Sequence, residues 1–221
     1  MKARETLKLS GNALTTVKDT LIFLGMDPDG EECTALVRNN IVMMINAASA
    51  YVETQTGREF GRKERRERYE GTGSQKLILN HYPIRGISMI KDISSGGLIK
   101  ESDYYLEEEG KSGILHKDDG WPGRGYPSGL ANDVNTFKKS IEVIYTSGYI
   151  LPKDGTCKEP SDLPYDIQYA VWTMIQQQWN LLASGGGGLS AFSISDVSWT
   201  FDNTESPVVT EMVNKYKRWS V

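Results

Sequence analysis

One segment, residues 31–60, constrains the fold of this chain more than any other. Its apolar residues recur with the i, i+3, i+4, i+7 spacing of a helix that buries one stripe. They are Leu36, Val37, Ile41, Met44, Ile45, Ala48, Tyr51 and Val52. Gly57 follows, and glycine readily adopts the left-handed conformation that ends a helix. A helix of about 27 residues is about 40 Å long and here carries no catalytic motif, which favours a structural or assembly protein over an enzyme.

Three shorter helices are predicted on either side of a middle region. The first covers 14–25, with Thr15 or Thr16 as its N-cap. The second runs from Pro164, in its first turn, to about Ser184, with an apolar face that includes Leu181. The last begins at Pro207. Four consecutive glycines precede it, and we expect Gly185, Gly186, Gly187 and Gly188 to act as a hinge because glycine has the largest backbone freedom.

From residue 60 to 149 the apolar period changes from 3.6 to 2, which predicts strands. Turns rich in glycine and serine separate these strands, and this spacing is typical of an antiparallel sheet or small barrel. The expected strands cover 76–79, 84–93, 104–106, 113–115 and 140–145.

Together these patterns predict an α+β fold. A small helical bundle with a long central helix carries an inserted antiparallel β subdomain, and a C-terminal helix follows the glycine-rich joint. The expected parts are 1–60 (N-terminal helices), 61–149 (β insertion), 150–184 (third core helix with its leading loop) and 185–221 (joint, β segment and docking helix).

Composition excludes several classes of protein. Hydrophobic residues make up 38% of the 221 residues, so the chain should bury a core. The net charge of −4 argues against a dedicated DNA-binding domain, which carries a basic excess.

Cys33 and Cys157 fit no zinc spacing, and we expect free thiols in a reducing compartment. No apolar run reaches the roughly 18 residues that span a bilayer, and the start lacks a signal peptide core. We therefore expect synthesis in the cytoplasm and no membrane partner.

The sequence contains no recognisable motif of an enzyme active site or of a cofactor-binding site. Residues 71–76 lack the spacing of a phosphate-binding loop. His81 and His116 lack the close ligand spacing of a zinc site, and we expect surface or turn histidines. Cys33 is expected in the first helical turn, buried as a small apolar residue. The acidic runs Glu107–Glu109 and Asp118–Asp119 are expected in solvated loops. The sequence thus predicts no catalytic residue, no cofactor and no metal.

A cluster of charge lies at residues 58–68. Its cations could contact nucleic acid phosphates or an acidic protein, or they could keep an exposed edge strand from unwanted pairing. The two interpretations are compatible. The candidate partner contacts are Arg58, Arg62, Lys63, Arg65, Arg66 and Arg68.

The C-terminal helix is the second candidate contact. Aromatic residues, Met and Arg are enriched at interfaces, and this helix combines them with lysines. It could dock on the core of its own chain, on another subunit or on a partner. The candidate residues are Val208, Val209, Met212, Tyr216 and Trp219.

In order and spacing, short motifs over residues 12–202 resemble those of a known family, the head–tail connector (adaptor, or head-completion) proteins of long-tailed bacteriophages. The motifs are 52–60 (VETQTGREF), Tyr69-Glu70-Gly71, Leu77-Ile78-Leu79, Tyr82-Pro83-Ile84, 144–149 (IYTSGY), Leu163-Pro164 and Ile194-Ser195-Asp196.

This resemblance implies a structural protein of the virion neck, assembled in the cytoplasm of the bacterial host. It implies a ring, usually of twelve subunits, under the portal protein of a filled capsid. The other face of the ring would meet a further neck (stopper) or tail-completion protein, and genomic DNA would pass through the lumen without sequence-specific binding. The β insertion of about 85 residues is long for the family.

Other functions stay open at this stage. A β-rich module for carbohydrate would use Trp121, Tyr126 and Tyr104 as stacking rings. A neighbouring neck or tail-completion protein would share the architecture. An enzyme with a pocket in the β region would need a nucleophile, metal set or cofactor loop that the sequence does not reveal.

Overall fold

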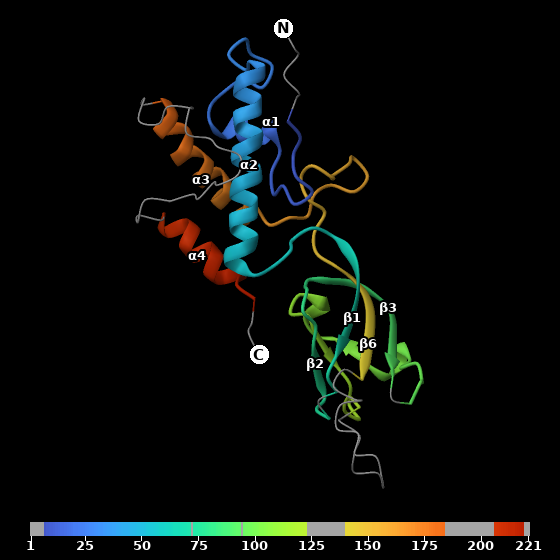
Figure 1. Cartoon of the computed structure of the whole chain (residues 1–221). Helices are drawn as coiled ribbons and strands as arrows, with labels where there is room; N and C mark the ends of the chain where they lie inside the picture. The colour runs from blue at the N-terminus through green and yellow to red at the C-terminus, as the bar shows by residue number, and fades with distance from the viewer. Residues whose placement is uncertain (1–6, 72, 94, 123–139, 184–205, 219–221) are drawn as a thin grey trace. The chain divides into compact units, whose positions relative to one another are not determined.

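The computed structural model describes residues 7–71, 73–93, 95–122, 140–183 and 206–218. They form two compact units (Figure 1). The helical unit contains Met1–Phe60 and Ile150–Val221, and the β unit contains Gly61–Tyr149. The predicted α+β class is confirmed.

The described residues of the helical unit form four helices: α1 (Val17–Phe23), α2 (Ala35–Thr56), α3 (Tyr165–Ala183) and α4 (Pro207–Tyr216). The central α2 contacts the other three. Its buried face includes Ile41, Met44, Ile45, Ala48 and Val52, as the spacing predicted, but Leu36, expected on the same face, is 51% exposed. On α3 the buried face includes Val171 and Met174, but Leu181 is 55% exposed rather than part of it.

The long helix α2 is shorter than predicted because it begins later. Thr34 is its N-cap and accepts a hydrogen bond from the Val37 amide at 3.3 Å. Cys33 therefore precedes the helix, and the expectation that it lies in the first turn is wrong. Its buried thiol donates to the Asp27 carbonyl at 3.0 Å. The other end agrees with the sequence, since Gly57 caps α2 in the left-handed conformation with φ 64°.

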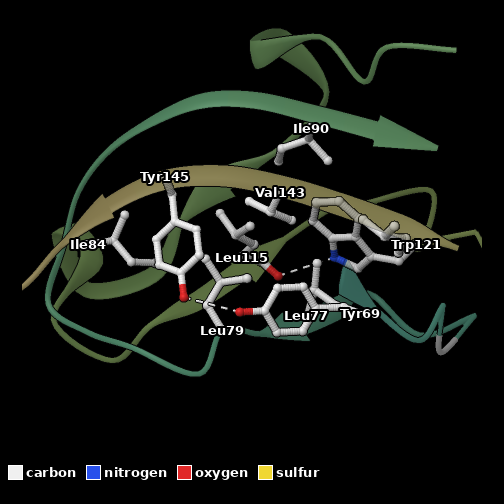
Figure 2. Close-up of a cluster of buried hydrophobic side chains, with 10 residues drawn as sticks. Tyr69, Leu77, Leu79, Ile84, Ile90, Leu115, Trp121, Val143 and Tyr145 are labelled. Carbon is white, nitrogen blue, oxygen red and sulfur yellow. Dashed lines mark hydrogen bonds between the residues drawn. The ribbon is translucent and has the colours of Figure 1, made fainter. Parts of the chain in front are cut away.

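The β unit holds two three-stranded antiparallel sheets. One has the order β1-β6-β3 and the other β2-β5-β4. The strands are β1 (Lys63–Tyr69), β2 (Lys76–Ile78), β3 (Ile84–Asp92), β4 (Tyr105–Leu106), β5 (Ile114–His116) and β6 (Ile141–Ser147). Both sheets contribute to one core, which includes Leu77, Leu115, Trp121, Val143 and Tyr145 (Figure 2).

Candidate partner-contact surfaces

Helix α4 docks on its own unit through two apolar side chains. Val209 and Met212 are each 4% exposed, and α4 contacts α2 and α3. Val208 is 42% exposed, and Tyr216 is partly buried. Trp219 lies outside the described residues. Of the four predicted contact residues that the structure describes, Val208 alone therefore offers an exposed apolar side chain.

A polar latch holds the C-terminal end of α4 to the first turn of α3. Lys215 Nζ lies 2.5 Å from Asp166 Oδ2, and the Tyr216 hydroxyl donates to the same carboxylate at 2.9 Å. Burial would raise the pKa of Asp166, but the hydrogen bonds from Lys215 and Tyr216 lower it below its usual value. The charged carboxylate is thus the form that holds α4.

Arg58 belongs to this docking site rather than to an exposed charge cluster. Its guanidinium carbon lies 5.3 Å from the centre of the Phe60 ring and 5.9 Å from that of Tyr216, and the residue is buried. Such cation–π contacts stabilise a desolvated arginine. The chain beyond α4 is also tied to α2, because the Arg218 amide donates to the Thr56 carbonyl at 2.7 Å.

The rest of the predicted basic cluster lies in the β unit, on and just before β1. This strand is at the edge of its sheet. Arg65 points to the buried side, where its Nε donates to Ser147 Oγ at 2.9 Å. Arg62 and Lys63 are exposed.

Arg66 and Arg68, on the other side of β1, share one carboxylate. Both donate to Glu142 of β6, Arg66 through two nitrogens at 3.1 and 3.0 Å and Arg68 at 3.2 Å. Their side chains are still 66% and 59% exposed. The hydrogen bond from Arg66 is the main cause of the lowered pKa of Glu142. The two arginines are therefore fixed in place while exposed to a partner.

Sequence reasoning missed a buried polar network between β1 and β6. Glu67 Oε2 accepts hydrogen bonds from the hydroxyls of Tyr69 and Tyr145, and its Oε1 lies 3.4 Å from His81 Nε2. Figure 2 shows the two tyrosines meeting in the core. Burial would raise the pKa of Glu67, but hydrogen bonds from His81, Tyr69 and Tyr145 lower it to about 2. His81 is thus part of a network rather than a simple turn residue.

His116 also has carboxylate neighbours that its sequence position did not predict. Glu107 lies 3.5 Å from Nδ1 and Asp118 lies 3.3 Å from Nε2, while the Tyr105 ring stacks at 4.8 Å. Within the part of the chain that the structure describes, no group of three or more His, Cys, Asp or Glu is arranged to hold a metal ion. No helix among the described residues is long and apolar enough to cross a membrane.

Trp121 is a core residue, so its expected role as a carbohydrate-stacking ring is wrong. It is 2% exposed, and its indole N–H donates to the carbonyls of Gln75 and Leu115. Tyr104 is half-buried, 6.3 Å from the Trp121 ring. Tyr126 and the predicted hinge, Gly185–Gly188, lie outside the described residues.

Comparison with known families supplies the decisive observation. Residues 14–120 match the family model described as "Head completion protein". Over these residues, a little under half of the chain, the protein is similar to the head completion protein family. The matched residues include α1, α2 and the β unit as far as β5, and the resemblance drawn from the sequence is confirmed. No match is found among the curated proteins.

Solved structures with a similar fold extend the likeness to the whole chain. A chain from the neck of an empty gene transfer agent particle, computed with C6 symmetry, is 12% identical with a TM-score of 0.53. The alignment covers 98% of this chain and 96% of that one. A chain from the virion of a native gene transfer agent particle is 15% identical with a TM-score of 0.53, over 100% and 97%.

A third similar chain is from the neck of a native gene transfer agent particle computed with C12 symmetry. It is 16% identical with a TM-score of 0.50, and the alignment covers 100% of this chain and 97% of that one. At such low identity these likenesses establish a shared fold. The family likeness thus covers α1, α2 and the β unit as far as β5, and the likeness in fold extends through α4.

Proposed function

We propose that this protein is a structural subunit of the neck of a phage-like particle. In this proposal it forms a ring, with twelve copies as the expected number, beneath the portal protein of a DNA-filled capsid. The family likeness and the whole-chain likeness to neck components support it, and the observation that carries most weight is that two of those necks have ring symmetry, C6 and C12.

The ring would serve as an adaptor between two partners. One face would meet the portal protein, and the other a further neck (stopper) or tail-completion protein. We assign contact roles to the exposed cations Arg62, Lys63, Arg66 and Arg68, and to α4. The exposed Val208 could contact a partner directly, whereas Val209 and Met212 could do so only if α4 left its site.

Genomic DNA would pass through the lumen without sequence-specific binding. A strongly basic lumen would hold phosphates through counterion release, and the net charge of −4 suits a channel in which DNA must slide. The protein would assemble in the host cytoplasm and act by binding alone, with no catalytic step and no cofactor.

The test is the mass of the purified protein by light scattering, alone and after mixing with the portal protein of the same particle. We expect either closed rings or a monomer that joins the portal in a fixed ratio, with the ring visible by electron microscopy. A monomer that does not bind the portal protein would contradict the proposal.

A further inference from the structure

The connection between α3 and α4 is much longer than the observed docking requires. Residues 184–206 separate Ala183 from Pro207. About 23 residues can span roughly 75 Å when extended. Connections between packed helices usually have only about 2–8 residues. The length of this connection therefore needs an explanation beyond joining two neighbouring helices.

The distance to be bridged within one chain is short. Lys215 and Tyr216, at the end of α4, contact Asp166 at the start of α3, so the two helices run antiparallel (Figure 1). At about 1.5 Å per residue, α3 extends about 26 Å beyond Asp166, and α4 begins about 14 Å back from Tyr216. The end of α3 and the start of α4 are thus only about 15 Å apart, allowing for an interaxial distance of about 9 Å.

The site that receives α4 is complete on α2, α3 and the segment after α2. It offers Asp166 to Lys215 and Tyr216, the Arg58 guanidinium to the Tyr216 ring, and the Thr56 carbonyl to the Arg218 amide. Nothing in these contacts depends on whether the helix comes from the same chain. The α4 of a second copy would make the same hydrogen bonds and bury the same Val209 and Met212.

We propose that α4 is exchanged between neighbouring copies in the ring, each copy giving its α4 to the docking site of the next. The inference rests on the proposed function, because a ring brings a second docking site within reach of the connection. Exchange of an identical element is a low-cost way to join protomers, since it conserves the contacts of the monomer. A head-to-tail exchange repeated around a closed ring leaves every site filled.

This exchange places α4 on a neighbouring copy, whereas the sequence left open its own core, another subunit and an external partner. The ring also raises the local concentration of docking sites, so that a modest contact is enough to hold a helix in trans. An α4 that stayed in its own chain could contact a neighbouring copy only through exposed side chains such as Val208.

The test uses the close approach of Gly57 and Arg218. A Cβ placed on Gly57 would lie 3.7 Å from the Arg218 Cβ, which is within the spacing of a disulfide. Both variants carry Cys157→Ser to remove the exposed thiol, while the buried Cys33 stays. One chain carries Gly57→Cys and a second carries Arg218→Cys. The two are mixed, assembled into rings alone or on the portal protein, and oxidised.

Exchange predicts a covalent dimer of the two chains on a non-reducing gel, absent from rings of either variant alone. In rings of the doubly substituted chain it predicts a ladder of covalent multimers. The proposal is overturned if mixed rings give no dimer while the doubly substituted chain forms only an internally bridged monomer.

A second pair of cysteine substitutions covers the case in which Gly57→Cys does not fold, because the left-handed backbone at Gly57 disfavours a side chain. This pair places Asp166→Cys on one chain and Lys215→Cys on the other, and a short bismaleimide joins the two thiols. Exchange again predicts a covalent dimer, and its absence predicts only an internal bridge in the doubly substituted chain. If the wild-type protein forms no ring, alone or on the portal, the proposed function fails and the exchange with it. If rings form and every link is internal, only the exchange fails.

Discussion

The two units of this protein hold their carboxylates in different ways. In the β unit Glu67, whose side chain is 23% exposed, joins the tyrosines of β1 and β6. In the helical unit the latch of Asp166 and Lys215 lies at the rim, with the Asp166 side chain 38% exposed. Pulling β1 from β6 would separate Glu67 from Tyr145 and break a ladder of seven residue pairs, whereas lifting α4 exposes two apolar side chains. We therefore expect the β unit to open less readily than the docking site of α4.

The largest effect is expected from removing the ring at the centre of the β unit. Trp121→Ala should lower the free energy of unfolding by about 4 kcal/mol, because it leaves a cavity and removes the indole N–H that donates to the Gln75 and Leu115 carbonyls. Ile22→Ala, at a side chain that is 55% exposed, is the control and should cost under about 0.5 kcal/mol. Urea unfolding followed by circular dichroism measures both, and equal losses would contradict the assignment of Trp121 to the core.

A smaller and more local effect is expected for α4. Met212→Ala should cost about 2 kcal/mol through lost burial. Because α4 is held at the rim, the loss should appear as faster hydrogen exchange of the α4 amides, with protection of β6 unchanged. Val208→Ala, one turn away, is the matched control and should change neither the free energy of unfolding nor the hydrogen exchange of the α4 amides. Loss of protection in both units together would break the distinction between them.

The third prediction concerns the stability of the fold at acidic pH. The pKa of Glu67 is about 2 in the folded protein, against an ordinary value of 4.5. A carboxylate with a lowered pKa stabilises the fold above its ordinary pKa, and this contribution disappears as pH falls from about 4.5 to 2. After allowance for solvent screening we expect a loss of about 1–2 kcal/mol.

Glu67→Gln tests this contribution directly. The variant should be less stable than wild type at pH 7, and the difference should shrink toward pH 2. Unfolding midpoints at several pH values provide the measurement. A difference that stays constant with pH would mean that the Glu67 charge does not stabilise the β unit.

The smallest effect is expected at the latch. Asp166→Asn keeps the shape but removes the charge that holds Lys215 and Tyr216, and should cost about 1 kcal/mol. The loss should raise the exchange rate of the last turn of α4. Gln177→Ala, at an exposed position of α3, serves as the control. An unchanged exchange rate in the last turn of α4 would show that the apolar contacts alone hold the helix.

Local patterns predicted those elements that local forces determine. Short apolar and alternating runs located β2, β3, β4, β5 and β6 to within one or two residues at their ends, although the central strand β6 is buried along most of its length rather than on one face. Gly57 ended α2 as expected. The start of α2 was misjudged because Arg38 folds back on the carbonyls of Pro28 and Cys33 and holds this segment in turns.

Contacts between distant strands could not be predicted from spacing. Glu67 meets Tyr145 because β1 pairs with β6, 78 residues later. The run of arginines suggested one exposed cluster, yet Arg58 and Arg65 are buried in different units with different partners. Alternation along β1 could have indicated that Arg65 faces the core side. Nothing in the sequence indicated that Arg58 would lie against Tyr216.

The most direct test of the central claim is a cryo-electron microscopy reconstruction of the neck of a particle that carries this protein. The account predicts a closed ring of copies of this chain in contact with the portal. A neck without density for this chain, or with isolated copies that do not close into a ring, would contradict it.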